Sequence, residues 1–296
     1  MTAPLVSVVI PAYNGGELLR AAVDSVLAQT YEPIEIVVVD DESPEPIEPF
    51  LTEVLDRIRV VRQANTGTAG ARNRGVREAR GEFVALLDQD DLWDPDKLAR
   101  QMPKFDDPAI ALVHAGARFV NTEGMVTSTV TADPNLDTHR MLEACHLAVQ
   151  TAVIRRSVLG DVGLFDTSLS AADDWDMWIR IIDRFRVAAV PEPLATVRVH
   201  PGNQSNNAEL MYSSAQQLLA KHAHIHGSCR ECRQALRKAA LANRQSYYGR
   251  LRHQARDRAA AGDRAGALRL TARGLRRHPG ALIETPLHYL RRGAKR

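Results

Sequence analysis

Short apolar runs alternate with amphipathic stretches along the first part of the chain. Four runs rich in β-branched or aliphatic residues predict buried strands: Val6 to Ile10, Ile34 to Val39, Val60 to Val61 and Phe83 to Leu87. Between them, an apolar helical face is formed by Leu18, Leu19, Ala22, Val23, Val26 and Leu27, and a second helix is predicted over Ala69 to Arg80. This alternation favours an α/β fold with a parallel sheet.

The pattern continues less regularly to about His200. Further strands are predicted at Ile110 to His114, Arg118 to Val120, Ala152 to Ile154 and Val187 to Val190. Helices are predicted near Pro95 to Phe105, His139 to His146 and Asp174 to Arg184. From Asn207 onward Ala, Leu, Arg and Gln dominate, which predicts helices throughout. We therefore expect an α/β domain over residues 1–205 and a basic α-helical extension over residues 206–296.

Residues 245–280 of this extension predict a helical hairpin. Helices over Tyr247 to Ala261 and Ala265 to Arg277 flank a Gly262-Asp263 turn, and Pro279-Gly280 ends the second helix. The hairpin resembles one tetratricopeptide-type unit, and a single unit cannot form a solenoid.

Composition is that of an ordinary globular protein. The chain has 296 residues, of which 45% are hydrophobic and 25% charged, enough for one large core. Three cysteines supply no disulfide framework, the N-terminus lacks the features of a signal peptide, and no long apolar run predicts a membrane span. These features lead us to expect a cytoplasmic protein.

The two parts of the chain carry opposite charge. Residues 1–204 contain 19 Lys and Arg against 31 Asp and Glu, whereas residues 205–296 contain 19 against 5. Such a basic segment binds nucleic acid, lies on an anionic membrane, or is a solvated helical face. Nucleic acid is disfavoured because the segment lacks interleaved aromatic residues. The other two alternatives remain open, including for Pro286 to Arg296, which is either a membrane-surface segment or a solubilising tail.

Three carboxylates follow the apolar run that ends at Leu87. Asp88, Asp90 and Asp91 repel one another unless a cation lies between them, and carboxylate oxygens suit Mg²⁺ or Mn²⁺. The alternative is an Asp-rich turn that caps the following helix. The position favours the metal, because ligands of open α/β sheets bind at the carboxyl ends of the strands.

Two further segments carry polar groups at the ends of predicted strands. Asp40 and Asp41 would accept hydrogen bonds from a base or ribose, although, taken alone, this segment favours capping of the local turn by Asp41 or Ser43. The loop Asn65 to Gly70 leads into a helix bearing Arg72, which predicts an anion site or a simple turn.

A third acidic cluster opens the helix predicted near residue 174. Asp173 and Asp174 either stabilise the helix N-terminus or supply a general base for an acceptor hydroxyl. Trp175 offers an apolar platform for a sugar ring.

Taken together and in order, these motifs resemble the family 2 glycosyltransferases of the GT-A fold. The resemblance covers about residues 5–205 and rests on VSVVIPAYNGG, IEIVVVDDES, NTGTAGARNRG, FVALLDQDDLWDPDKL, VGLFD, DDWDMWIRI and VRVHPGNQS. It implies a Rossmann-like domain that binds a nucleotide-diphosphate sugar and inverts the anomeric centre. It also implies Mn²⁺ or Mg²⁺ as cofactor and a glycan or lipid-linked acceptor.

The resemblance also assigns site residues. Donor contacts are implied for Pro11, Ala12, Tyr13, Asp40, Asp41, Arg72 and Asp88, metal contacts for Asp90 and His200, and general-base catalysis for Asp174. Asp91, Asp173 and Trp175 are implied to support the site or contact the acceptor. Two departures from the family pattern are Asp173, where Glu is usual, and Gln150-Thr151, where smaller residues are usual.

Other interpretations are weaker. A nucleotidyltransferase needs a basic loop after the first strand, and Pro11-Ala-Tyr-Asn-Gly-Gly has no Lys or Arg. A catalytically silent scaffold for glycan assembly is disfavoured by the intact carboxylates. A zinc site among His222, His224, His226, Cys229 and Cys232 is weakly indicated, because alternate residues of a helix point in different directions.

Overall fold

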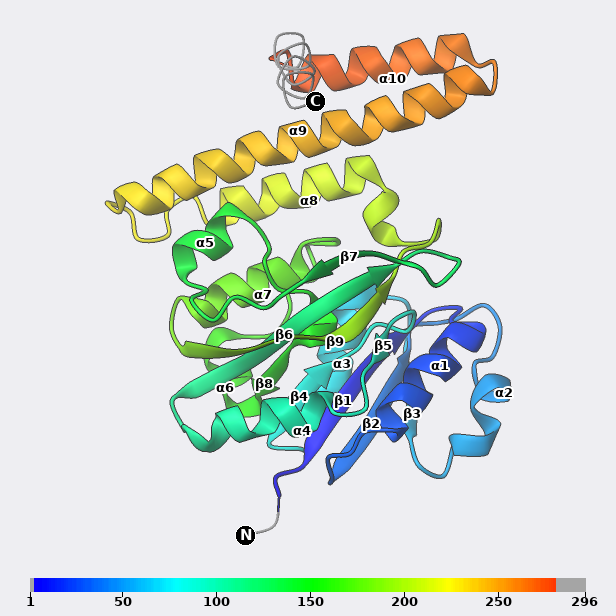
Figure 1. The fold of residues 1–296 in the computed structure, drawn as a ribbon, viewed down its shortest axis with the longest axis vertical. Helices are drawn as coiled ribbons and strands as arrows, with labels where there is room; N and C mark the ends of the chain where they lie inside the picture. The colour runs from blue at the N-terminus through cyan, green and yellow to red at the C-terminus, as the bar shows by residue number, and fades with distance from the viewer. Residues whose placement is uncertain (1–2, 281–296) are drawn as a thin grey trace. The chain divides into compact units, whose positions relative to one another are not determined.

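The computed structural model describes residues 3–280, and the chain divides into two compact units after Asn203. The first unit is built on a nine-stranded sheet in the order β3-β2-β1-β4-β8-β6-β9-β5, with β7 paired to β6 (Figure 1). One half of this sheet is parallel and consists of β1 (Val6–Ala12), β2 (Ile34–Asp40), β3 (Arg59–Arg62) and β4 (Phe83–Leu86). Every residue of β1 and β4 is buried, because both faces of a parallel sheet are covered.

The other half of the sheet is mixed, and the expectation of a parallel sheet is wrong there. β8 (Val153–Arg155) runs antiparallel to β4 and β6, and β5 (Leu92–Trp93) runs antiparallel to β9. The two long strands β6 (Ile110–Val120) and β9 (Arg186–Arg198) are parallel to each other. Strand direction depends on the path of the connections, which apolar runs do not encode.

β6 is one strand where two short strands were predicted. Small residues interrupt its apolar pattern at Ala115 to Ala117, yet pairing with β9 continues through them with shifts of register beside Gly116. A Cβ at Gly116 would lie 2.6 Å from the main-chain oxygen of Val130 in β7 (Val126–Val130). The glycine therefore permits a close approach of two backbones rather than ending a strand.

Seven α-helices belong to the described part of the first unit: α1 (Gly16–Leu27), α2 (Glu48–Leu51), α3 (Gly67–Glu78), α4 (Lys97–Gln101), α5 (Thr138–Glu143), α6 (Arg156–Val162) and α7 (Asp173–Ile182). Short 3₁₀ turns cover Thr52–Val54, Met102–Asp106 and Val149–Thr151. The helix predicted to reach Phe105 changes to 3₁₀ geometry after Gln101, because Pro103 cannot donate an α-helical hydrogen bond. The helix predicted to reach His146 ends at Glu143.

The second unit is helical over its described residues. A 3₁₀ turn at Gln204–Asn206 precedes α8 (Ala208–Lys221), α9 (Arg230–Ala260) and α10 (Arg264–Arg277). Helix α9 begins at Arg230, well before the predicted start at Tyr247, so the first helix of the predicted hairpin is the end of a longer one. The carboxylate of Asp263 caps α10 by accepting a hydrogen bond of 2.8 Å from the amide of Gly266. The segment Pro286 to Arg296 lies outside the described residues.

Among residues 3–280, no helix has both the length and the apolar character needed to cross a bilayer.

Candidate functional site

The carboxyl ends of the parallel strands bring the predicted polar segments to one edge of the sheet. The register pairs Ala12 with Asp40 and Val9 with Leu86. Tyr13, Asp41 and the turn that begins at Asp88 therefore follow neighbouring strands at the same edge, where ligands of α/β sheets bind.

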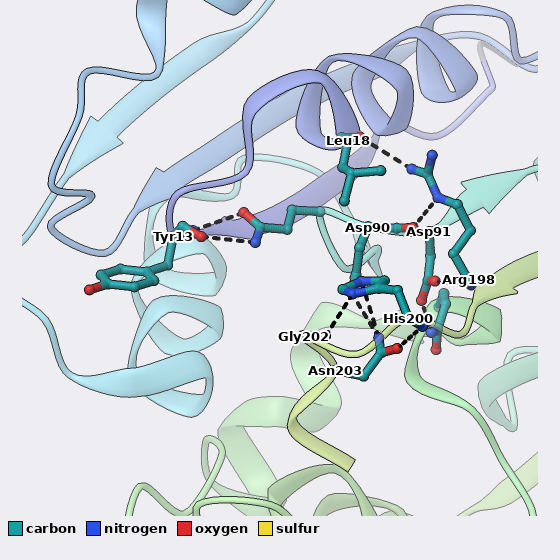
Figure 2. Close-up of polar contacts among 10 residues, drawn as sticks. Tyr13, Leu18, Asp90, Asp91, Arg198, His200, Gly202 and Asn203 are labelled. Carbon is teal, nitrogen blue, oxygen red and sulfur yellow. Dashed lines mark hydrogen bonds and ion pairs between the residues drawn. The ribbon is translucent and has the colours of Figure 1, made fainter. Parts of the chain in front are cut away.

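Asp90 meets the segment that follows β9. Its Oδ2 lies 3.0 Å from Nε2 of His200 and 3.1 Å from Nδ2 of Asn203, as Figure 2 shows. Asp90 and His200 are each about a quarter exposed, so a ligand can reach them. Burial, followed by the nearby charge of Asp88, raises the pKa of Asp90.

This donor set fits a divalent cation. A carboxylate oxygen and an imidazole nitrogen are ordinary ligands of Mn²⁺, and such ions bind one or two protein side chains while phosphates and water complete the shell. Burial and then the charge of Asp88 raise the pKa of Asp90, and a bound cation would counter both effects.

Asp91 is fully enclosed, with 2% of its surface exposed. Its Oδ1 accepts a hydrogen bond of 2.8 Å from the amide of Arg198, and its Oδ2 accepts one from the side-chain amide of Gln150. The guanidinium of Arg198 in turn donates to the main-chain oxygen of Asp90. Asp91 therefore holds the end of β9 against the Asp88 to Asp91 turn and has almost no surface open to an acceptor.

Arg72 links the turn after β4 to helix α7. Its two terminal nitrogens donate to Oδ1 of Asp88 and Oδ2 of Asp173, each at 2.7 Å. The side chain of Arg72 is only 6% exposed. Although burial lowers the pKa of Arg72, the charges of Asp88 and Asp173 raise it overall. A nucleotide contact by Arg72 stays a prediction, and in this structure both ends of its guanidinium bind carboxylates.

Asp174 stands at the N-terminus of α7 beside this network. Burial, followed by the charge of Asp173, raises its pKa to about 7, although Arg72 acts in the opposite direction. Asp88 also acts on this pKa, so Asp174 shares one electrostatic environment with the turn after β4. The indole of Trp175 donates a 2.6 Å hydrogen bond to the main-chain oxygen of Met141, which joins α7 to α5.

Asp40 and Asp41, two of the predicted donor-binding residues, have different partners. Asp40 is buried and bound to Arg62 at 2.5 Å and to the amide of Ser43 at 2.9 Å. Asp41 accepts hydrogen bonds from Gln63 at 2.8 Å and from the amide of Thr66 at 2.9 Å. Both carboxylates thus order the loops around the strand ends.

Residues 11 to 13 differ in exposure. Pro11 and Ala12 are buried within β1, so their contact with a nucleotide stays a prediction. Tyr13 is 51% exposed, and its ring points away from Asp90 and His200 (Figure 2).

Several residues of the site were not singled out by the sequence. The side chain of Gln89 exchanges two hydrogen bonds with the main chain of Tyr13, at 2.9 and 3.0 Å. Asn73 exchanges two with the main chain of Phe165, both at 2.8 Å, and so ties α3 to the segment before α7. Asn203 lies in the VRVHPGNQS motif, three residues after His200, and that spacing was the available signal.

The structure gives limited support to the zinc site considered among the histidines and cysteines of residues 222–232. The Sγ atom of Cys232 lies 3.5 Å from Nδ1 of His226, while Cys229 accepts a hydrogen bond from the amide of Cys232 at the start of α9. Between residues 204 and 280, no three His, Cys, Asp or Glu side chains gather their ligand atoms within 4.8 Å. The described part of the helical unit therefore does not form a zinc site by itself.

A model of the family described as "Glycosyl transferase family 2" matches residues 7–163, more than half of the chain. The chain belongs to glycosyltransferase family 2. An uncharacterised glycosyltransferase of Rickettsia typhi is 32% identical over 219 residues, which cover 69% of this chain and 67% of the relative. The Escherichia coli protein WfaP, a UDP-Glc:α-D-GlcNAc-diphosphoundecaprenol β-1,3-glucosyltransferase, is 29% identical over 209 residues, which cover 69% of this chain and 80% of WfaP.

Solved structures share the GT-A fold of this family 2 glycosyltransferase. TarS 1-349 of S. aureus in complex with UDP-GlcNAc superposes with a TM-score of 0.60 at 17% identity, covering 90% of each chain. The mannosyltransferase PcManGT of Pyrobaculum calidifontis in complex with GDP-Man and Mn²⁺ gives a TM-score of 0.61 at 21% identity, covering 98% of this chain and 86% of PcManGT.

The family match covers only part of the candidate site of this glycosyltransferase. It includes the strand ends, Arg72 and the Asp88 to Asp91 turn, and it ends before Asp174 and His200. The contacts of Asp90 with His200 and of Arg72 with Asp173 join the matched segment to the part beyond it.

Proposed function

We propose that this chain transfers a sugar from a nucleotide-diphosphate donor to an acceptor hydroxyl in one inverting displacement, with Asp174 as the general base. The observation that carries the proposal is the acidic pair Asp173-Asp174 at the start of α7, which the ion pairs of Arg72 with Asp173 and Asp88 join to the turn that bears Asp90. Burial, followed by the charge of Asp173, raises the pKa of Asp174 to about 7. A base with a pKa near the working pH is the most effective at removing a proton.

The proposed donor lies along the strand ends with its nucleotide near Tyr13, Asp40, Asp41 and Asp88. Names of relatives support a uridine nucleotide, because WfaP uses UDP-Glc and one TarS structure holds UDP-GlcNAc. PcManGT holds GDP-Man, so guanosine donors belong in the same assay.

Asp90 and His200 are proposed to hold Mn²⁺ or Mg²⁺, supported by their 3.0 Å contact and by the Mn²⁺ in the PcManGT complex. When bound, the ion supplies positive charge to the departing diphosphate. Asp91 stays behind this pair and keeps β9 in place, while Arg72 keeps Asp88 and Asp173 in fixed positions.

At the acceptor side, Asp174 accepts the hydroxyl proton as the oxygen attacks the anomeric carbon from the face opposite the diphosphate. Trp175 borders this side, because its indole is fixed to Met141 and the residue is partly exposed. An apolar face of a sugar ring is the natural contact for such a side chain.

The assay is transfer from radiolabelled UDP-Glc, UDP-GlcNAc or GDP-Man to a polyprenyl-diphosphate-linked sugar, with Mn²⁺ and after chelation. We expect product with at least one donor, loss of product on chelation, and a turnover of Asp174→Asn at least about a hundredfold lower. Asp174→Asn should still bind UDP with Mn²⁺ in calorimetry. Near-native turnover by Asp174→Asn would exclude Asp174 as the base.

The acceptor is proposed to be lipid-linked and reached at the inner face of a membrane. WfaP acts on a diphosphoundecaprenol-linked sugar, which supports this acceptor class. Helix α9 supports the location through four exposed arginines at spacings of three, four and seven residues: Arg230, Arg233, Arg237 and Arg244. These spacings place the four on one helical face.

The charge of this arginine face, Arg230 to Arg244, is not neutralised within the described part of the helical unit. None of its four guanidinium groups pairs with a described carboxylate, whereas Arg277 binds Glu209 at 2.8 Å and Arg258 binds Asp263 at 3.0 Å. Each basic residue near an anionic bilayer contributes about 1 kcal/mol. Four such residues would strengthen binding by roughly 4 kcal/mol, close to a thousandfold.

Vesicle flotation tests this surface. The chain should float with vesicles containing phosphatidylglycerol and not with pure phosphatidylcholine, and changing the four arginines to Gln should abolish flotation. The matched control changes four other arginines of α9 and α10 to Gln: Arg252, Arg256, Arg264 and Arg269. Equal flotation of both quadruple variants would show that total charge, and not the arginine face, governs any binding.

A further inference from the structure

Gln150 joins two segments of the site without reaching its surface. It lies in the 3₁₀ turn Val149–Thr151 before β8 and is 5% exposed. Its main-chain oxygen accepts a 2.8 Å hydrogen bond from the indole of Trp93, and its side-chain amide donates to Oδ2 of Asp91. The turn before β8 is therefore fastened to both ends of the short segment Asp91 to Trp93.

Asp91 carries this restraint to the metal-binding pair. Its second oxygen holds the amide of Arg198, the last residue of β9, at 2.8 Å. His200 follows two residues later and meets Asp90 at 3.0 Å. Since Asp90 and Asp91 are neighbours in the chain, a rotation of the Asp91 carboxylate would move His200 relative to Asp90.

Gln150 is well suited to prevent that rotation. Among residues 3–280 it is the one side chain that donates to Asp91, because the other donor is the main-chain amide of Arg198. A buried carboxylate oxygen that loses its donor is strongly destabilised and seeks another partner. The amide thus selects one orientation of Asp91.

We propose that Gln150 is a positioning residue that acts through Asp91 to keep Asp90 and His200 at ligand distance for a divalent ion. This proposal rests on the proposed function, in which Asp90 and His200 hold the metal. Residues that orient metal ligands from behind typically contribute tenfold to a hundredfold in metal affinity.

The test measures Mn²⁺ binding by electron paramagnetic resonance of free Mn²⁺ at fixed UDP, independently of turnover. Gln150→Met preserves the volume and removes the donor, and Asp91→Asn changes its acceptor. We expect each variant to bind Mn²⁺ at least about tenfold more weakly. The double variant should bind no more weakly than the weaker single one, because both changes break the same link.

Gln101→Met is the matched control. Gln101 is also buried, and its amide donates to the main-chain oxygens of Val113 and Thr151 at 3.0 and 2.8 Å. This variant should melt at a lower temperature with unchanged Mn²⁺ affinity, and its effects should add to those of Asp91→Asn. If circular dichroism shows that Gln150→Met is unfolded, Gln150→Asn replaces it, since the shorter amide falls short of Asp91.

Native Mn²⁺ affinity in a folded Gln150 variant would overturn the positioning role alone. Losses that multiply in the double variant would also overturn it, because Gln150 would then act independently of Asp91. Failure of the unaltered chain to bind Mn²⁺ with UDP would overturn the metal assignment of Asp90 and His200 together with this proposal.

Discussion

Replacing Arg72 by Met should shift the pH dependence of turnover, because Arg72 is the positive group that lowers the pKa of Asp174. The unaltered carboxyl has a pKa of about 7, so the active base form is about half populated at pH 7. Loss of the guanidinium raises this pKa further. A rise of about one unit corresponds to about 1.4 kcal/mol and leaves roughly a tenth of the molecules with an ionised base at pH 7. Turnover at pH 7 should fall roughly fivefold and recover above pH 8.

The same substitution should lower stability. Arg72 holds the buried carboxylate of Asp173 at 2.7 Å, and removing one member of a buried ion pair costs about 3–5 kcal/mol. Ionisation of Asp174 already opposes folding, because its folded pKa lies above the value in the unfolded chain. The free energy of unfolding should therefore fall as the pH rises toward 7 and Asp174 ionises. In Arg72→Met this fall should extend above pH 7.

The assay is a pH profile of kcat between pH 5.5 and 9 with melting curves over the same range. Arg72→Lys is the control, since it keeps the charge and loses the two-point contact. The Arg72→Lys variant should keep the acidic limb of its kcat profile near pH 7. Its melting temperature should be lower than that of the unaltered chain. An acidic limb that stays at pH 7 in Arg72→Met would refute the assignment of Arg72 as the group that tunes Asp174.

Three smaller predictions concern single side chains. His200→Ala should raise the Mn²⁺ concentration for half-maximal activity roughly tenfold to a hundredfold; an unchanged value in the metal titration would remove His200 from the ligand set. Trp175→Phe should lose the hydrogen bond to Met141 and lower the free energy of unfolding, measured by chemical denaturation, by about 1 kcal/mol. The variant's KM for the acceptor should rise more than its KM for the donor; equal changes in both KM values would argue against an acceptor platform. Gly116→Val should lower the melting temperature markedly, because its Cβ would meet the Val130 oxygen at 2.6 Å; a melting temperature within 1 °C or so of the unaltered chain would contradict this packing.

Helices and strands that are specified by their own residue pattern could be predicted from the sequence. β1, β2 and β4 are apolar runs in a sheet that is covered on both faces, and α1 has an unbroken apolar face. β7 could not be predicted, since all five of its residues are exposed and its pairing with β6 alone makes it a strand. Helix α9 extends far beyond its predicted start because Ala and Arg favour helix even where few residues are buried.

The residues of the candidate site also fall into two groups, those that local sequence indicates and those that only the tertiary structure brings in. The carboxylates of Asp88, Asp90 and Asp174 could be chosen from the chain, because acidic residues after an apolar strand or at a helix start have local signatures. Their partners could not, since Arg72 meets Asp173 across 101 positions and Gln150 meets Asp91 across 59. Local spacing determines which residues share a strand end or a helix face. Only the folded sheet decides which buried charge lies beside which donor, because that depends on how distant segments close around one another.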